Sequence, residues 1–289
     1  MFGDIGKAAV INNATFSDRV EQRMRDVDSL VCVGLDPAIE KLPSHMAPTV
    51  ESVVDFCQAI VEATHPYTAA YKPNLGFFAA LGRPGFNSLW AVRHSIPAGI
   101  PVILDCKVGD VDETARAYAS GWFTEFGFDA ITVSPYLGED AMAPFLAYEG
   151  KGVIVLCKTS NRGSGDFQDL PVGDGDALYL TVANRCREWE ERYPASVGLV
   201  VGATYPDQLR SVRERVGDQL ILLPGVGAQG GGLETSLHAG LNSRGVGLLC
   251  SASRDIMFTS NGKDFDLMAQ RRAEEMRNRI NEIRSTFNS

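Results

Sequence analysis

Histidine is scarce in this sequence and its few cysteines are scattered, which argues against a metal or redox centre. The 289 residues include four histidines and six cysteines. No two cysteines are spaced like a zinc-ligand pair or a redox dithiol, and the histidines are too dispersed to suggest a ligand set. We therefore expect no metal, and we expect buried free thiols in a reducing compartment.

The sequence also has fewer basic than acidic residues, and it has no long apolar run. Lys and Arg number 27 against 36 Asp and Glu, a formal net charge of -9. Such a balance argues against nucleic acid or an anionic membrane as the main partner, although a local pocket can still bind a small anion. No run approaches the ~20 apolar residues that span a bilayer, and no secretory signal pattern is evident. The sequence thus predicts a cytoplasmic protein.

Short apolar runs recur along the chain, with helix-like stretches between them. Eight can be counted, at 31–35, 69–71, 102–104, 130–133, 153–156, 197–201, 220–223 and 246–249. Because hydrophobicity within each run is continuous rather than alternating, the runs indicate strands buried on both faces of a parallel sheet. Eight such strands alternating with helices favour a (β/α)8 TIM barrel, with a doubly wound open sheet as the alternative.

The two ends of the chain lie outside this repeat. Segments 15–27 and 265–287 both have the pattern of amphipathic helices. No linker or low-complexity tract interrupts the chain, so we predict one domain over residues 1–289. Its barrel core is expected at about 30–258, with extra N- and C-terminal helices.

Charged residues follow the first three runs directly. Asp36 follows the first run, Lys72 the second, and Asp105, Lys107 and Asp110 the third. In barrels of this kind, chemistry takes place where strands end and loops begin. These strand ends are therefore expected to bring two lysines and three carboxylates to one rim.

The third of these segments carries the sharpest signal. Asp105 and Lys107 are one residue apart, so on a strand their side chains share a face, and Asp110 follows a turn at Gly109. A lysine between two carboxylates stays protonated and can donate a proton to a developing carbanion, which suits loss of carbon dioxide. A salt bridge that only stabilises the rim is the alternative, and the company of Asp36 and Lys72 favours the catalytic interpretation.

Three further loops have the composition of a ligand site. Segment 224–232 after the seventh run is rich in glycine, and Ser253 and Arg254 follow the eighth run. Glycine lets backbone N–H groups approach an anion and arginine binds it through two N–H groups, so these loops are candidates for a phosphate site. Loop 158–168 is long and polar, which fits either hydrogen bonding to a heterocycle or a mobile surface loop.

The order of these motifs resembles one enzyme family closely. The pattern consists of Asp105-x-Lys107-x-x-Asp110 followed by Thr114, with Lys72 on an earlier strand and Arg254 after the last. Gly-Leu-Asp-Pro at 34–37, Tyr-Lys-Pro-Asn at 71–74 and Thr-Ser-Asn at 159–161 complete it. This pattern is similar to the orotidine 5′-monophosphate (OMP) decarboxylase family, in its longer bacterial branch, from about residue 30 to 258.

The resemblance implies a function and a role for each residue. The chain would convert OMP to uridine 5′-monophosphate (UMP) and carbon dioxide in de novo pyrimidine biosynthesis, without a cofactor, and Lys107 would protonate carbon 6. Asp105 would lie beside the departing carboxylate, and Lys72 and Asp36 would contact the ribose. Ser160 would bind the pyrimidine, and Arg254 with Gly227 and Gln229 would hold the phosphate. Thr159 and Ser253 are further substrate-binding residues. Asp110 and Thr114 would reach into the partner's site in a homodimer with shared active sites. Gln168 is an alternative to Gln229 at the phosphate.

Two other functions fit part of the pattern. A metal-dependent sugar-phosphate lyase or aldolase would use the acidic rim to bind magnesium, and it needs another carboxylate, for which Glu139 and Asp140 are the candidates. A non-enzymatic phosphosugar-binding barrel would keep Arg254 and the glycine loop. It has no need of the Asp105, Lys107 and Asp110 cluster, so this cluster counts against it.

Overall fold

Eight parallel strands form the centre of the protein. A computed structural model describes residues 14–173, 175–226 and 232–286. The strands are β1 (Val31–Leu35), β2 (Ala70–Pro73), β3 (Ile103–Val108), β4 (Ala130–Val133), β5 (Gly152–Lys158), β8 (Ser196–Val201), β9 (Ile221–Pro224) and β10 (Leu248–Ala252). Each overlaps one of the eight apolar runs. Most of their residues are buried, as expected for strands covered on both faces.

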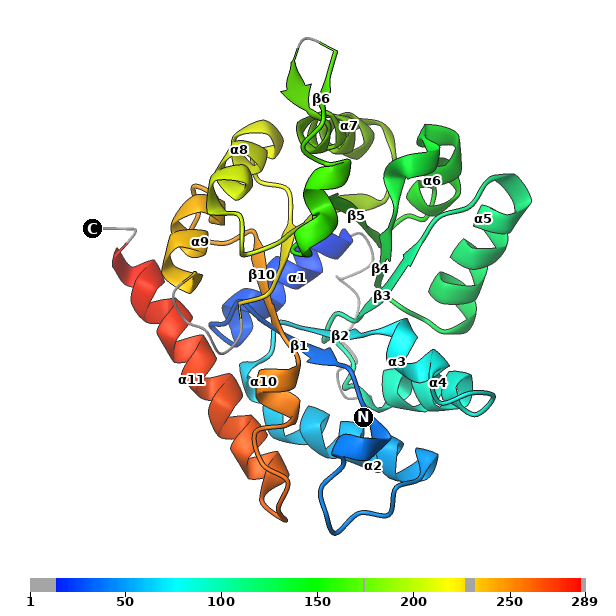
Figure 1. The fold of residues 1–289 in the computed structure, drawn as a ribbon, viewed down its shortest axis with the longest axis vertical. Helices are drawn as coiled ribbons and strands as arrows, with labels where there is room; N and C mark the ends of the chain where they lie inside the picture. Colours follow the sequence, from blue (N-terminus) through cyan, green and yellow to red (C-terminus); the bar gives the residue numbers. More distant parts are fainter. Residues whose placement is uncertain (1–13, 174, 227–231, 287–289) are drawn as a thin grey trace, which may run out of the picture.

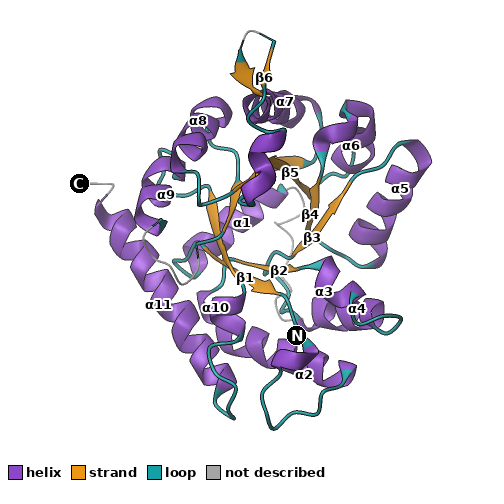
Figure 2. Ribbon diagram, in the orientation of Figure 1, coloured by secondary structure: helices purple, strands orange, loops and turns teal. Residues whose placement is uncertain are grey.

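The sheet closes on itself, which confirms a TIM barrel and not an open sheet. The strand order is β2-β1-β10-β9-β8-β5-β4-β3, and all neighbours in it are parallel. The two outer strands meet through parallel bridges, Tyr71 with Val102 and Asn74 with Asp105. Figure 2 shows the strands as a central ring with helices around it. The barrel is thus closed by contacts between β2 and β3.

Helices cover the outside of the barrel (Figure 1). They are α2 (Val50–Thr64), α3 (Leu75–Ala79), α4 (Gly85–Ser95), α5 (Asp112–Ser120), α6 (Glu139–Leu146), α7 (Leu178–Arg192), α8 (Pro206–Val216), α9 (Leu233–Gly240) and α10 (Arg254–Met257). A π-helical turn, Gly121–Glu125, prolongs α5, and 3-10 turns lie at Ile39–Lys41, His65–Tyr67, Pro135–Leu137 and Arg162–Asp166. A short antiparallel pair, β6 (Pro171–Val172) with β7 (Asp176–Ala177), precedes α7.

The two terminal helices are present. Helix α1 (Phe16–Asp26) begins with a capping box at Thr15, and it buries Phe16 against Gly152 at the start of β5, where any side chain would collide with the Phe16 ring. Helix α11 (Phe265–Ser285) packs on α2 and α9. It ends before residue 287, which lies outside the described residues. The single-domain organisation stays a prediction.

No helix in the described part of the chain is long and apolar enough to cross a membrane. Five of the six cysteines are buried, and Cys106 is partly buried. Burial raises the pKa of the Cys32 thiol to about 12, so this thiol stays protonated near neutral pH.

Candidate active site

Three charged side chains meet where β2 and β3 end. The largely buried carboxylate of Asp105 lies 2.9 Å from the ammonium of Lys72 and 2.5 Å from that of Lys107, with one oxygen facing each. Closure of the barrel makes this possible, because the bridge between Asn74 and Asp105 aligns the two strand ends. The expected cluster of Lys72, Asp105 and Lys107 therefore exists as one contiguous ion network.

Two uncharged side chains complete the hydrogen bonding of this carboxylate. The Thr132 hydroxyl donates to Asp105 Oδ1 at 3.0 Å, and the Asn74 amide donates to Oδ2 at 3.4 Å. The Thr132 oxygen also accepts the Lys107 backbone N–H at 2.9 Å. Sequence reasoning did not single out Thr132. Its signal was that it is the one polar residue within the apolar run 130–133.

Burial and charge act in opposite directions on the two inner groups. Burial disfavours the ionised form of Asp105, but Lys72 and Lys107 outweigh it and lower the pKa of the carboxyl to about 2. Burial likewise disfavours the charge on Lys72, and Asp105 with Asp36 reverses this and raises the Lys72 pKa. Side-chain exposure is 6% for Lys72 and 11% for Asp105, against 49% for Lys107. Lys107 is thus the member of the network that a ligand can reach.

The backbone at Lys107 departs from strand geometry. Its φ is +49°, in the left-handed region that non-glycine residues seldom adopt, and the β3–β4 register shifts between Leu104 and Val108. The prediction that strand alternation places Asp105 and Lys107 on one face was therefore right about the contact and wrong about its cause. The ammonium reaches Asp105 from a bulge. Strained backbone of this kind is concentrated at functional sites.

Asp110 and Thr114 lie apart from the ion network. Asp110 accepts a hydrogen bond from the adjacent Val111 N–H at 2.8 Å, and Thr114 is exposed on the first turn of α5. Among the described residues, Lys107 has one carboxylate partner, Asp105, instead of the two that the sequence suggested. Within one chain, Asp110 does not complete the expected charge alternation.

The end of β1 brings Asp36 beside the last strand. Asp36 Oδ1 is buried and has no hydrogen-bond partner among the described residues. At Gly34, a side chain would collide with that of Ser253, so the missing Cβ lets the β10 end lie directly against β1. The charge of Asp36 contributes, after that of Asp105, to the raised pKa of Lys72.

The loop after β5 folds back on itself. Thr159 and Gln168 form a reciprocal pair, in which the Thr159 N–H donates to Gln168 Oε1 at 2.9 Å and Gln168 Nε2 donates to the Thr159 hydroxyl at 2.8 Å. Ser160, which follows, is exposed. The Gln168 side chain thus braces its own loop through its oxygen and one of its two amide N–H groups.

Arg254 is exposed at the end of β10. Its guanidinium makes no hydrogen bond or ion pair with any residue that the structure describes, and Ser253 beside it is partly buried. Val226 is the last described residue before the glycine-rich gap. Gly227 and Gln229, the other two residues predicted to bind phosphate, lie outside the described residues.

Comparison with known proteins identifies the family. Residues 29–263 match the orotidine 5′-phosphate decarboxylase / HUMPS family. The chain is 46% identical over 271 residues to orotidine 5′-phosphate decarboxylase of Thermomicrobium roseum, covering 93% of this chain and 96% of that protein. It belongs to this family. The relatives include another bacterial decarboxylase, from Cupriavidus metallidurans, at 44% identity over 93% of this chain and 99% of that one.

Solved structures of decarboxylases share the fold. The OMP decarboxylase of Leishmania donovani superimposes with a TM-score of 0.82 at 43% identity, covering 94% of this chain and 99% of that chain. The family match begins just before β1 and ends before α11, so it includes every strand of the barrel and all the charged residues of the ion network.

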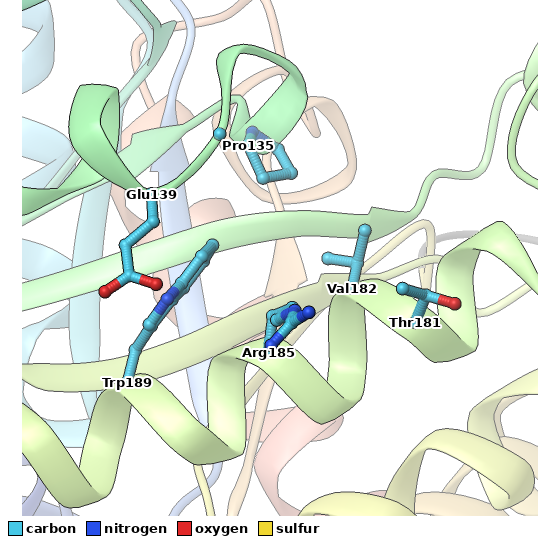
Figure 3. A pocket seen from close by; sticks show the side chains of 7 residues that line it. Pro135, Glu139, Thr181, Val182, Arg185 and Trp189 are labelled. Carbon is cyan, nitrogen blue, oxygen red and sulfur yellow. The ribbon is translucent and has the colours of Figure 1, made fainter.

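Glu139, one of the two carboxylates considered for a metal-dependent sugar-phosphate lyase or aldolase, is already paired with other side chains. Glu139 forms an ion pair with Arg192 at 2.9 Å and accepts a hydrogen bond from the Tyr193 hydroxyl at 2.9 Å. The hydrogen bond from Arg192, followed by that from Tyr193, lowers the Glu139 pKa to about 2. Figure 3 shows the Glu139 carboxylate beside the Trp189 ring, in a groove between the start of α6 and helix α7. In the described residues, no group of three or more His, Cys, Asp or Glu side chains could hold a metal ion.

Proposed function

We propose that Lys107 donates the proton that replaces carbon dioxide on carbon 6 of OMP. The observation that carries this proposal is a half-exposed ammonium 2.5 Å from a buried carboxylate, whose other oxygen is held by a second ammonium. As the bond from carbon 6 to the carboxylate breaks, its electron pair stays on the ring. The proton then moves from Lys107 Nζ to carbon 6, and the neutral amine regains a proton from solvent.

Family membership gives the overall activity. The chain is an orotidine 5′-phosphate decarboxylase, a carboxy-lyase of pyrimidine biosynthesis. Charges held in place before the substrate arrives suit this reaction, because preformed electrostatic stabilisation of a developing carbanion needs no reorganisation at the moment of bond cleavage. Asp105 would lie beside the departing carboxylate, and their repulsion would raise the energy of the bound substrate.

The remaining residues are proposed to bind the nucleotide. Asp36, with an unpaired buried oxygen, would accept hydrogen bonds from the ribose, assisted by Lys72. Thr159 and Ser160 would bind the pyrimidine. Arg254 and Ser253, with Gly227 and Gln229, would hold the phosphate, and binding energy from this non-reacting group would serve catalysis at the ring.

The direct test is decarboxylation of OMP in the presence of a chelator. Purified protein is added to OMP with excess chelator, and the loss of OMP absorbance and the formation of UMP are followed. Conversion under these conditions supports a metal-free decarboxylase, and loss of conversion in Lys107→Ala would then support Lys107 as the proton donor. No conversion, or activity on a sugar phosphate that appears only with magnesium, would move the assignment to a metal-dependent lyase.

We also infer a homodimer with shared active sites. Asp110 lies outside the ion network of its own chain, and exposed apolar side chains occur next to it in sequence, just after β4 and on α5. They are Val111, Tyr118, Tyr136 and Leu137, and Tyr136 is 81% exposed. An apolar surface next to an incomplete site favours a second copy that supplies Asp110 and Thr114 across the interface.

Mixing two inactive variants tests the sharing. Lys107→Ala and Asp110→Ala subunits are unfolded, combined and refolded together. If Asp110 serves the partner's site, each mixed dimer contains one complete site, so about a quarter of wild-type activity should return. If Asp110 acts in its own chain, both subunits of a mixed dimer stay defective and no activity returns.

A further inference from the structure

A fully buried lysine at the end of β5 takes no part in the proposed chemistry. The Lys158 side chain is 1% exposed, and its ammonium donates to both carboxylate oxygens of Asp169, at 2.7 and 2.8 Å. It also donates to the Ser164 hydroxyl at 3.1 Å and lies 4.6 Å from the centre of the Tyr205 ring. A buried cation is costly unless it is paired, so its partners are strongly constrained in position.

These partners belong to the segment that follows β5. Ser164 and Asp169 are part of residues 159–169, here called the Ser160 loop, and Tyr205 lies in the connection after β8. The Ser164 hydroxyl also contacts the Tyr205 hydroxyl at 3.4 Å. One ammonium thus links the barrel wall to both the middle and the end of the Ser160 loop.

The start of the loop is fixed by two further contacts. The pair of Thr159 with Gln168 joins the first residue of the loop to the residue before Asp169. On the other side, Gly202 lies so close to Ser160 that a Cβ there would be 2.7 Å from the Ser160 Cα. The Gly202 N–H also donates to the Lys158 carbonyl at 2.8 Å. Ser160 is therefore confined between the β8 end and a loop closed by Lys158.

We propose that Lys158 is a positioning residue for the pyrimidine. By pairing with Asp169 and Ser164, it holds the Ser160 loop in the shape that presents Ser160 to the ring. This proposal rests on the proposed function, because it assigns Ser160 to OMP. Lys158 itself is too deeply buried to contact the substrate, so its influence falls on substrate binding rather than on the protonation step.

The decisive variant is Lys158→Met, which keeps the volume and removes the charge. Asp169 is 46% exposed and can be solvated when its partner is gone, so the fold should survive. We expect KM for OMP to rise about tenfold, the size of one lost hydrogen bond, with a smaller change in kcat. Trypsin should also cleave faster after the exposed Arg162 in the middle of the loop.

Arg215→Met is the matched control. It removes another ion pair to an aspartate just before α7, that of Arg215 with Asp176 at 2.9 Å, without touching the Ser160 loop. Its KM and its cleavage after Arg162 should equal those of the wild type. If Lys158→Met behaves like this control, or loses only thermal stability, Lys158 is merely structural and the proposal is wrong.

Two milder variants, Ser164→Ala and Lys158→Arg, test the proposal even if Lys158→Met does not fold. Ser164→Ala removes one hydrogen bond from the ammonium and keeps the ion pair, so it should fold even if Lys158→Met does not, with increases in KM and cleavage of about threefold. Lys158→Arg should restore part of the affinity. The cleavage assay needs no activity, so a wild-type protein that fails to convert OMP would overturn the proposed function while loop anchoring is still measured.

Discussion

The rim of the barrel has two halves that are built in different ways. At the ends of β2, β3 and β4, the ion network joins Lys72, Asp105 and Lys107 over distances of 2.5 to 2.9 Å. At the ends of β5 and β10, Ser160 and Arg254 are exposed, and neither side chain forms a hydrogen bond with the described residues. In the first half, Lys72, Asp105 and Lys107 are already paired with one another before a ligand binds, whereas the second half offers free donors.

This difference follows from what each half has to do. Groups that stabilise a developing charge act best when they are already oriented, and mutual pairing of buried charges provides that orientation. Groups that grip a phosphate or a ring edge can remain solvated, since the ligand supplies their partners. Mutations in the first half should therefore lower turnover, and mutations in the second half should weaken substrate binding.

The largest expected effect is that of Lys107→Ala. Without the reachable ammonium, turnover of OMP should fall on the order of 10⁴-fold, while UMP affinity stays largely intact. Turnover is followed by absorbance and UMP binding by calorimetry. A variant that fails to fold would show that the lysine serves stability instead, and would break the division between the halves.

Asp105→Asn should harm both turnover and stability. It leaves Lys72 buried with one fewer negative charge beside it, and we expect the free energy of unfolding to fall by about 3 kcal/mol, with turnover reduced at least about 100-fold. Urea unfolding and OMP conversion measure the two effects. An unchanged unfolding midpoint would mean that the network does not need its central charge.

Arg254→Ala probes the opposite half. Loss of a charge-assisted contact to phosphate should weaken UMP binding about 10- to 100-fold and leave the free energy of unfolding unchanged. The exposed Arg271 on α11 provides a control, because Arg271→Ala should change neither quantity. Unchanged affinity in Arg254→Ala would remove the phosphate assignment.

The smallest expected effect is that of pH on the free energy of unfolding. The folded pKa of Asp105, about 2, is below its ordinary value of 3.8, so its stabilisation is present above that value and is lost as pH falls through about 2. The Lys72 pKa is raised above 10.5, so its stabilisation is complete below 10.5 and is lost at higher pH. The difference in unfolding free energy between wild type and Asp105→Asn should thus be constant from about pH 5 to 9.

At acid pH, the difference in unfolding free energy between wild type and Asp105→Asn should change. As pH falls from about 4 to 2, Asp105 becomes protonated and the difference between wild type and Asp105→Asn should shrink by about 2 kcal/mol. Urea unfolding at several pH values measures it. A difference that already changes near neutral pH would show that another group controls the network.

Much of the barrel could be predicted from local sequence, because buried parallel strands leave continuous apolar runs. The runs 31–35 and 130–133 coincide with β1 and β4. The run at 102–104 captured only the start of β3, since the strand continues through Asp105 and Lys107, where polar residues end the apolar signal. The charged residues at the end of β3 thus indicated the site, but they also made the end of the strand unpredictable from the apolar pattern.

The sequence by itself determined the eight strands, the two terminal helices and the charged residues at the strand ends, because these depend on periodicity and on residue type. Tertiary structure decided that β2 and β3 meet, that Lys107 reaches Asp105 from a left-handed bulge, and that Thr132 completes the carboxylate's hydrogen bonds. It also decided that Gln168 forms hydrogen bonds with Thr159 and that the buried Lys158 forms an ion pair with Asp169. Such contacts depend on closure of the ring, which joins residues that no local pattern relates.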